Sequence, residues 1–506
     1  MVMAGNAPDL NDLQKDLKDF FSQKYGAQVQ FAQPEQEGSA SDPPVKMEPV
    51  NLRFDMKPEE LEAYLNTYVV RQYEAKEILA TKICTHFNRI RLQEEDEEPV
   101  GNIKNNLILI GPTGVGKTYL IKLIARRIGV PFVKGDATKF SETGYVGGDV
   151  EDLVRSLVHE ADGVIELAQY GIIYIDEIDK IASSGNTVGP DVSRTGVQRA
   201  LLKLMEETDV DLQAPHDLAS QMENALQFQK SGKVKRKRIN TRNILFIVSG
   251  AFSSLEDLIK RRLSQSSMGF ARDDIASSKP KDGEWLPYVA PEDLIAYGFE
   301  SEFIGRLPVI GVLHPLSADD LFEILKNPKN PVILAKKQDF KSYGITIDFD
   351  TDALRIVADR AFNERTGARG LVGVMEKILI KYEKRLPSTS VKGFTVTRAV
   401  VEHPERELEK LLIDTAITRF EERFKELNDI HLTLDTDARQ SLVEAAKAEG
   451  RTAEEVGMER FKDYAQGLRL IRVTELMVPA TAVSEPSDYL ENLIKKFYEN
   501  KPTKSD

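Results

Sequence analysis

The chain has 506 residues, of which 41% are hydrophobic and 29% are charged, a composition typical of a globular protein with roughly two to four domains. Its 68 basic and 81 acidic residues leave a net charge of −13, which argues against non-specific binding to nucleic acid or to an anionic membrane. The single cysteine, Cys84, excludes an internal disulfide framework and a cysteine-rich zinc module, which fits a reducing compartment. No apolar run approaches the length needed to span a membrane and no secretory signal is apparent, so we expect a cytoplasmic protein with no membrane partner.

The first 56 residues are expected to form a short helix and a linker. Leucine and phenylalanine recur at helical spacing between residues 8 and 24, whereas residues 31–50 are rich in Gln, Glu, Ser and Pro. Structure is expected to resume at Lys57, because Pro58 and two glutamates follow it as at a helix start.

A phosphate-binding loop is predicted between a strand and a helix in the next part of the chain. The apolar run Leu107–Ile110 leads into a glycine-rich turn, and Lys117 and Thr118 open a helix that ends at Gly129. Glycines allow successive backbone N–H groups to face one anion, Lys117 can reach the β- and γ-phosphates, and the Thr118 hydroxyl can bind Mg²⁺. The alternative, an accidental glycine turn, explains neither the strand before it nor the helix after it, so we predict a site for ATP and Mg²⁺. The predicted cofactor-binding residues of this loop are Pro112, Thr113, Gly114, Val115, Gly116, Lys117 and Thr118.

Two acidic side chains follow a buried strand further along the chain. The run Ile172–Ile175 delivers Asp176 and Glu177 at its end, and a later strand over residues 243–248 ends at Ser249. Asp176 is suited to hold hydrated Mg²⁺, and Glu177 to orient and deprotonate an attacking water. Acidic pairs are common at strand ends, but beside a phosphate loop they indicate ATP hydrolysis. The alternation of strands and helices predicts an α/β fold whose ligand sites lie at the carboxyl ends of parallel strands.

Three polar segments stand apart from this pattern. A loop at Gly144–Gly147 places an aromatic residue between glycines, and the long segment 263–290 contains Met268-Gly269-Phe270. Met268 and Phe270 of the long segment suggest docking to a partner pocket, with burial within the loop itself as the alternative. A predicted hairpin over residues 226–239 contains the basic run Lys233–Arg238, which we interpret as a solvated or peptide-contacting face.

Two arginines are candidates for phosphate binding. Arg306 lies in the segment Glu302–Pro308, and Arg369 lies in Thr366–Leu371, within a mainly helical part (residues 318–386) with one predicted strand at residues 345–347. A guanidinium group is always protonated and can bind two phosphate oxygens, although a lone arginine is more typical of a surface ion pair.

Together these motifs resemble the AAA+ ATPases, and within them the ClpX/HslU branch, with ClpX unfoldases the more similar. The resemblance spans about residues 57–400, roughly two-thirds of the chain. It implies a P-loop AAA+ large domain, with a parallel sheet flanked by helices, over residues 57–314 and a mainly helical small domain over residues 315–400. Residues 401–506 lie outside it and are expected to form a helical extension.

The resemblance assigns a role to each motif. Val69 and Val70 look like the residues that contact adenine, and Thr118 and Asp176 like the pair that holds the metal. The implied catalytic residues are Glu177, Arg306 as an arginine finger in the neighbouring subunit's site, Arg369 as the second sensor and Ser249 as the first. Tyr145 and Val146 look like the pore loop that grips polypeptide, and Met268, Gly269 and Phe270 occupy the place of the tripeptide that docks to the ClpP peptidase.

An arginine finger that acts on a neighbour implies a homohexamer. The resemblance therefore implies an ATP-dependent protein unfoldase and translocase, which threads protein substrates through a central pore to a ClpP-like peptidase. Two other functions stay open at this point: an ATPase that remodels complexes without a peptidase, and a nucleic-acid-binding AAA+ protein that uses the basic run. The acidic balance of the chain disfavours the second of these.

Several departures from the family pattern stand out. Cys84 alone cannot build the four-cysteine site of the ClpX zinc-binding N-terminal domain, so we expect that domain to be absent. Arg71 stands where the adenine segment of the family has a glycine, and Met268 replaces a branched aliphatic residue. Within the extension, residues 432–438 echo residues 345–353, which is compatible with a degenerate copy of the small domain or with chance.

Overall fold

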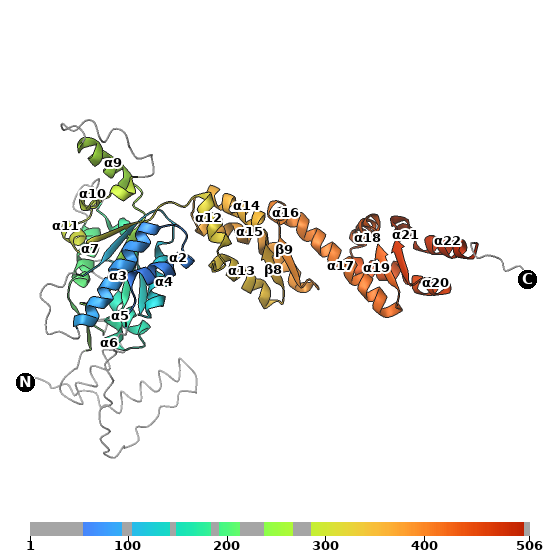
Figure 1. The fold of residues 1–506 in the computed structure, drawn as a ribbon, viewed down its shortest axis with the longest axis horizontal. Helices are drawn as coiled ribbons and strands as arrows, with labels where there is room; N and C mark the ends of the chain where they lie inside the picture. Colours follow the sequence, from blue (N-terminus) through green and yellow to red (C-terminus); the bar gives the residue numbers. More distant parts are fainter. Residues whose placement is uncertain are drawn as a thin grey trace, which may run out of the picture. The chain divides into compact units, whose positions relative to one another are not determined.

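The computed structural model describes residues 54–93, 104–141, 148–183, 192–212, 237–266 and 285–499. Figure 1 shows its elements along the chain. We refer to residues 54–312 as the sheet region, residues 318–403 as the helical region and residues 404–499 as the C-terminal region. Among the helices of the described ranges, none combines the length and the apolar character needed to cross a membrane.

Five parallel strands form the centre of the sheet region, in the order β2-β3-β6-β1-β7. They are β1 (Leu107–Ile110), β2 (Phe132–Asp136), β3 (Ile172–Asp176), β6 (Leu245–Gly250) and β7 (Val309–Val312). In register, Leu107 lies opposite both Ile247 and Val309, and Asp136 lies opposite Asp176. Because the strands run in one direction, their carboxyl ends share one edge of the sheet and their amino ends share the other. This arrangement confirms the predicted α/β class.

Helices cover both faces of the sheet, which explains why its strands are apolar at almost every position. Leu107 and Leu109 belong to the apolar core on one face, and Ile108 and Ile110 to the core on the other. The first core contains residues of α2 (Pro58–Tyr68), α3 (Tyr73–Gln93) and α4 (Lys117–Ile128). The second contains residues of α5 (Asp152–Glu160), α6 (Ile165–Ala168), α7 (Val192–Met205), α9 (Leu255–Ser266), α10 (Pro291–Tyr297) and α11 (Ser301–Gly305). The turns η1 (Ala137–Lys139), η2 (Ile178–Ile181) and η3 (Leu286–Tyr288) complete the region.

A small antiparallel pair, β4 (Asp209–Asp211) and β5 (Arg238–Asn240), comes between β3 and β6 along the chain. Of the hairpin predicted over residues 226–239, the described part therefore pairs with residues 209–211. The predicted helix over residues 8–24, the loop with Tyr145 and Val146, and the tripeptide Met268–Phe270 all lie outside the described residues.

The helical region contains α12 (Ala318–Lys326), α13 (Pro331–Ser342), α14 (Thr351–Asn363), α15 (Arg369–Arg385), η4 (Leu386–Ser388) and α16 (Arg398–Glu402). One strand was predicted here, but the structure has two parallel strands, β8 (Thr346–Phe349) and β9 (Gly393–Val396). β9 is defined by tertiary packing, because its Phe394 stacks on Tyr382 with ring centroids 5.1 Å apart and meets Phe340 at 5.4 Å.

The C-terminal region begins with the long helix α17 (Pro404–Asn428), which corresponds to the helix predicted there. It continues through β10 (His431–Leu434), α18 (Thr436–Glu449), α19 (Ala453–Arg460), α20 (Tyr464–Leu470), β11 (Glu475–Val478), α21 (Ala480–Ser484) and α22 (Pro486–Glu499). β10 and β11 are parallel, and a separate apolar core forms around them. Phe420 and Phe424 of α17 are fully buried in that core.

The burial of α17 predicts the cost of truncating its side chains. We expect Phe420→Ala to lower the free energy of unfolding of the C-terminal region by about 3–5 kcal/mol, because the ring leaves a cavity in a packed core. Leu427→Ala is the matched control, since Leu427 of the same helix is 62% exposed and its loss should have little effect. Chemical denaturation followed by circular dichroism would measure both, and equal losses for the two variants would contradict the packing described here.

Candidate functional site

The glycine-rich turn between β1 and α4 has the backbone of an anion-binding loop. Gly114 and Gly116 have φ angles of 79° and 101°, in the left-handed region that favours glycine. Gly116 is the N-cap of α4, so the N-terminus of this helix directly follows the turn. A turn of this kind, joined to a helix N-terminus, presents backbone N–H groups and a positive dipole end to a phosphate.

A cavity of about 400 Å³ opens onto this turn. That volume is in the range of sites for nucleotide-sized ligands. Residues from both the sheet region and the helical region line it. Those that the sequence predicted are Val69, Val70, Thr113, Gly114, Val115, Gly116, Lys117, Thr118, Asp176, Glu177 and Arg369. Pro112, Ser249 and Arg306 were also predicted site residues but do not line the cavity.

The residues predicted to hold Mg²⁺ are in direct contact. The Thr118 hydroxyl donates to Asp176 Oδ2 at 3.2 Å, and the Ser249 hydroxyl donates to Asp176 Oδ1 at 2.8 Å. Tyr174, a buried residue of β3, lies 2.6 Å from Ser249 Oγ and 3.1 Å from Thr118 Oγ1 through its own hydroxyl. Ser249 therefore acts on this site through Asp176. A hydroxyl and a carboxylate side by side next to a phosphate loop fit a hard, oxygen-preferring cation such as Mg²⁺.

Lys134 of β2 is the cation that pairs with Asp176. Its Nζ lies 3.0 Å from Asp176 Oδ2, the same oxygen that accepts from Thr118. Burial alone would raise the pKa of Asp176, but the hydrogen bonds from Ser249 and Lys134 outweigh it and hold that pKa below its usual value. The carboxylate is therefore ionised and ready to bind a cation. The Lys134 side chain is 45% exposed, so it can move away into solvent when another cation takes its place.

Lys117 is bound to the backbone of its own loop. Its Nζ donates to the carbonyl oxygens of Gly111 at 2.5 Å and Pro112 at 2.9 Å. Burial lowers the pKa of Lys117, although Asp176 acts in the opposite direction. The amine is thus held within the predicted phosphate turn, and Lys117 lines the cavity.

Glu177 has a backbone conformation that is unusual for its residue type. Its φ and ψ are 59° and 32°, and its backbone N–H donates to Asp176 Oδ1 at 3.2 Å. A non-glycine residue in the left-handed region costs about 1–3 kcal/mol and is found most often at functional sites. The exposed side chain of Glu177 lines the cavity next to Asp176. The Lys180 Nζ lies 3.3 Å from Asp179 Oδ2.

The helical region closes the cavity through one turn packed on the phosphate loop. The Ala368 N–H donates to the Gly114 carbonyl at 2.9 Å, and a Cβ added at Gly114 would lie 2.1 Å from the Thr366 carbonyl oxygen. Gly367, with a φ of 60°, makes this turn possible. Arg369 follows directly as the first residue of α15 and lines the cavity. Arg369, the second candidate arginine, therefore belongs to the same site as the phosphate loop of its own chain.

The break between α2 and α3 forms another wall of the cavity. Tyr68, Val69 and Val70 line it, and the buried Lys76 amine fixes the break by donating to the Val69 carbonyl at 3.0 Å. Arg71, which stands where the family has glycine, has a φ of 60°, so this position does favour glycine. Its guanidinium pairs with Asp320 of the helical region at 2.7 Å, which offsets part of that strain.

Arg306 lies at the opposite edge of the sheet. Its carbonyl accepts from the Asn106 side chain at 3.2 Å, and Asn106 directly precedes β1, whereas the phosphate turn follows the carboxyl end of β1. The length of β1, roughly 10 Å between its end residues, separates the two positions. The Arg306 guanidinium pairs with Glu206 at 2.6 Å on the surface. Arg306 is therefore remote from the cavity of its own chain.

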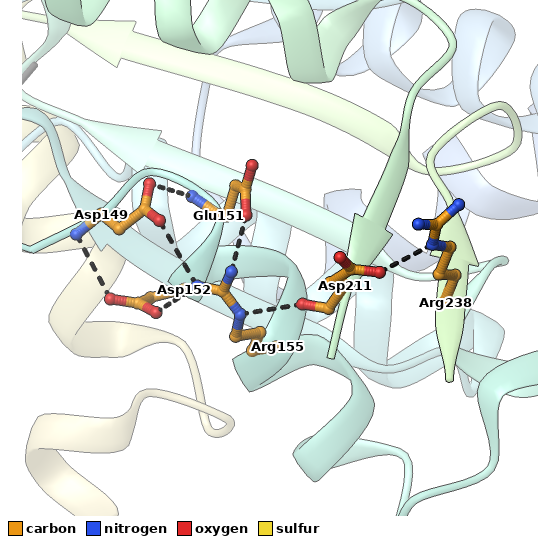
Figure 2. A network of polar contacts seen from close by, with 6 residues as sticks. All are labelled: Asp149, Glu151, Asp152, Arg155, Asp211 and Arg238. Carbon is orange, nitrogen blue, oxygen red and sulfur yellow. Dashed lines mark hydrogen bonds and ion pairs between the residues drawn. The ribbon is translucent and has the colours of Figure 1, made fainter. Parts of the chain in front are cut away.

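An arginine cluster fixes the flank of the loop that contains Tyr145 and Val146. Arg155 of α5 pairs with Glu151 at 2.6 Å and with Asp152 at 2.7 Å, and it reaches Asp149 at 3.5 Å (Figure 2). Its Nε also donates to the Asp211 carbonyl at 3.1 Å. Figure 2 further shows the Asp211 carboxylate paired with Arg238, at 2.7 Å, between β4 and β5. The cluster thus joins the start of α5 to the β4–β5 pair, although Tyr145 and Val146 themselves lie outside the described residues.

Lys134, Tyr174 and Arg155 were not predicted from the sequence. Lys134 interrupts an apolar strand, which is a weak signal, and only the pairing of β2 with β3 places it beside Asp176. Tyr174 looks like an ordinary core residue of a buried strand. Within the described ranges, no group of three or more His, Cys, Asp and Glu residues could form a metal site, so Thr118 and Asp176 would need phosphate and water to complete a Mg²⁺ shell.

Two family models match the chain. Residues 102–310 match the AAA domain of the Cdc48 subfamily, and residues 316–383 match the C-terminal, D2-small domain of ClpB protein. Among curated relatives, the chain is 39% identical over 345 residues to the ATP-dependent Clp protease ATP-binding subunit ClpX of Borrelia duttonii, a match that covers 67% of this chain and 77% of that protein. The same subunit of Treponema denticola is 38% identical over 338 residues, covering 66% of this chain and 78% of that protein.

The contact between Lys134 and Asp176 predicts a response to Mg²⁺. Replacing Lys134 with Met removes the cation paired with the partly buried Asp176 carboxylate, so we expect the protein to bind Mg²⁺ about fivefold more tightly. Thermal denaturation at increasing Mg²⁺ concentration, without nucleotide, would measure this as a rise in melting temperature that begins at about fivefold lower Mg²⁺ concentration. Lys139→Met is the control, because Lys139 is an exposed residue of η1. An unchanged dependence of the melting temperature on Mg²⁺ in Lys134→Met would mean that Lys134 does not compete with a cation at Asp176.

Proposed function

This chain belongs to the ClpX family of AAA+ ATPases, and from that premise we propose that it is an ATP-driven protein unfoldase that acts as a homohexamer and threads polypeptide through a central pore. That the chain is an ATPase of the Clp type follows from the family itself. The ring, the threading and the identity of the working residues are our proposal. We further propose that residues 57–314 form the large domain and residues 315–400 the small domain of the family.

The separation of Arg306 and Arg369 is the observation that carries this proposal. Arg369 lines the cavity of its own chain, whereas Arg306 lies at the amino edge of the sheet and pairs with Glu206. A single subunit therefore offers one of the two arginines to its nucleotide. In a closed ring with head-to-tail contacts, Arg306 of each subunit would face the carboxyl edge of the next, and every site would receive both arginines.

Within the site, we assign the chemistry of hydrolysis to residues of this chain. Bound Mg²⁺ would neutralise charge that develops on the phosphates, with the Thr118 hydroxyl as its direct ligand and Asp176 holding its water. Glu177 orients the attacking water and accepts its proton as the bond to the γ-phosphorus forms and the bridge to the β-phosphate breaks. Lys117 leaves the Gly111 and Pro112 carbonyls to bind phosphate oxygens.

Hydrolysis is coupled to motion through the turn that joins the two domains. Ala368 bonds to Gly114 of the phosphate loop, and Arg369 is the next residue. When the γ-phosphate leaves, the contacts available to Arg369 change, and the helical region can rotate relative to the sheet region. The Arg155 cluster holds the flank of the loop with Tyr145 and Val146, so that a movement of the sheet region would be passed to these pore residues.

A peptidase partner is proposed on the family relation. The relatives are named as the ATP-binding subunits of an ATP-dependent Clp protease. We propose that Met268, Gly269 and Phe270 of this chain dock to a ClpP-like peptidase ring. A remodelling ATPase without a peptidase is the alternative, in which the same ring and pore would act on protein complexes alone.

Mixing two inactive variants tests whether Arg306 works on the neighbouring subunit. Glu177→Gln blocks hydrolysis in its own site, and Arg306→Ala blocks it in the neighbour's site, so each variant alone should be inactive. In a one-to-one mixture, roughly a quarter of the interfaces combine an intact Glu177 with an intact Arg306, and we expect up to about that share of the wild-type ATP hydrolysis to return.

Phosphate release would be measured for each variant and for the mixture. Arg261→Ala, a substitution of an exposed arginine on α9, serves as the control and should retain full activity. A mixture that stays inactive, although both variants bind ATP and assemble, would show that Arg306 does not complete a site in a neighbour.

A second prediction concerns the pore loop. We expect Tyr145→Ala to keep ATP hydrolysis within about twofold of wild type while unfolding of a tagged fluorescent protein falls at least about tenfold, because hydrolysis would continue without a grip on the substrate. Tyr343→Ala is the control, since Tyr343 is a 62% exposed tyrosine of the helical region. Unfolding at the wild-type rate by the Tyr145 variant would remove this residue from the proposed function.

A further inference from the structure

The C-terminal region repeats the order of elements in the helical region. In the helical region, α13 is followed by β8, α14, α15, β9 and α16, and then by α17. In the C-terminal region, α17 is followed by β10, α18, the pair α19 and α20, β11 and α21, and then by α22. In both regions the two strands are parallel and four residues long, and they are joined through the intervening helices.

Individual hydrogen bonds are repeated as well. The Tyr382 hydroxyl donates to the Pro404 carbonyl at 2.9 Å, and the Tyr464 hydroxyl donates to the Pro486 carbonyl, also at 2.9 Å. Each tyrosine precedes its proline by 22 residues, and each proline is the first residue of the closing helix. A buried tyrosine tied to the start of the next helix is a specific contact, and its recurrence at equal spacing points to a duplicated domain.

The strand ends give a second, independent match. The Asp350 N–H donates to the Val396 carbonyl at 3.0 Å, and the Asp435 N–H donates to the Val478 carbonyl at 3.1 Å. Each aspartate is also the N-cap residue of the helix that follows, α14 or α18. The sequence echo at residues 345–353 and 432–438 thus coincides with matching backbone contacts.

The arginine at the matching place of the repeat is engaged within its own region. In the helical region, Gly367 and Arg369 lie at the start of α15, and the turn packs on the phosphate loop. In the C-terminal region, Gly450 has a φ of 66° and Arg451 follows it, so that Arg451 precedes Tyr464 by the same number of residues as Arg369 precedes Tyr382. The Arg451 guanidinium, however, pairs with Glu459 and Glu449 of its own region. An arginine engaged with these carboxylates is not available to a phosphate, so the repeat offers no nucleotide-sensing arginine at this place.

One helix belongs to both domains. α17 is the closing helix of the helical region and the opening helix of the C-terminal region, and it is continuous over 25 residues. Its Leu408 is buried in the core shared with the helical region, whereas Ile417 and Phe420 are buried in the C-terminal core. After Pro404, the helix contains no glycine or proline that could act as a hinge.

We propose that residues 404–499 are a second small domain that does not sense nucleotide and that moves with the first as one rigid body through α17. A helix of this length spans roughly 37 Å, so a rotation of the helical region would be carried outward and would displace the C-terminal region by a larger distance than the helical region itself. The rigid connection stands on the structure of α17, and only its nucleotide-driven movement rests on the proposed function.

Distances between spin labels test the rigid connection through α17 and its nucleotide-driven movement separately. Cys84 is fully buried, so labels would attach to introduced cysteines at exposed lysines: Lys341→Cys in the helical region, Lys462→Cys in the C-terminal region and Lys122→Cys in the sheet region. Doubly labelled chains, diluted with unlabelled protein so that distances within one subunit dominate, would be measured by pulsed electron paramagnetic resonance. Measurements would be made without nucleotide, with ADP, and with ATP in the Glu177→Gln background.

We expect the distance between labels at positions 341 and 462 to show one narrow distribution that is the same in all three states. The distance between positions 122 and 462 should shift with nucleotide. A broad or nucleotide-dependent distribution for the 341–462 pair would overturn the proposal. A narrow 341–462 distribution together with a constant 122–462 distance would keep the shared rigid body and would contradict the domain motion of the proposed function.

Glycines introduced into α17 test whether this helix is the element that holds the two regions rigidly together. Asp414 and Thr418 are exposed on this helix, so Asp414→Gly with Thr418→Gly would loosen it between the two cores without removing buried side chains. This variant should broaden the 341–462 distribution, and the matched pair Asp414→Ala with Thr418→Ala should leave it narrow. If the glycine variant stays as narrow as the alanine variant, α17 is not the element that joins the two domains.

Discussion

The common direction of the five strands is the constraint on which the whole site depends. Because the strands are parallel, the phosphate turn after β1, Asp176 and Glu177 after β3, and the end of β6 with Ser249 all meet at one edge of the sheet. The same constraint places Arg306, beside Asn106 before β1, at the other edge. The residues that we propose to be catalytic are thus divided between two edges, and the proposed ring of subunits would bring such edges together.

The charged side chains of the site are paired with other groups of the chain. Lys117 is held by two carbonyl oxygens of its own loop, and Asp176 is held by Lys134, Thr118 and Ser249. Each charged group therefore has a partner that a phosphate or a divalent cation can replace, so the buried charges cost little before ligand binds. The strained backbone of Glu177 lies in the same place, next to Asp176, the residue that we propose to hold metal-bound water.

The helical region is bound to the site by few but specific contacts. The turn at Thr366–Ala368 touches the phosphate loop at Gly114 so closely that a side chain there would not fit, and Arg71 pairs with Asp320 across the same boundary. In the proposed function, contacts of this kind would transmit the state of the site to the helical region. α17 then continues into a second core of the same design, which extends the mechanical unit beyond the part of the chain shared with the ClpX relatives.

The sequence alone determined the fold class, the phosphate loop, the acidic pair and the family, because these depend on short motifs whose residue types and spacing are imposed by local geometry. It also indicated that residues 432–438 resemble residues 345–353. A few residues at similar spacing carry little information, so the sequence could not show whether this similarity comes from a duplicated domain or from chance. Only the tertiary structure showed that Lys134 pairs with Asp176 and that Ser249 donates a hydrogen bond to the same carboxylate. It also showed that Arg155 connects α5 to the β4–β5 pair. These contacts join strands and loops far apart in sequence, and the pairing of parallel strands, rather than any local pattern, brings them together.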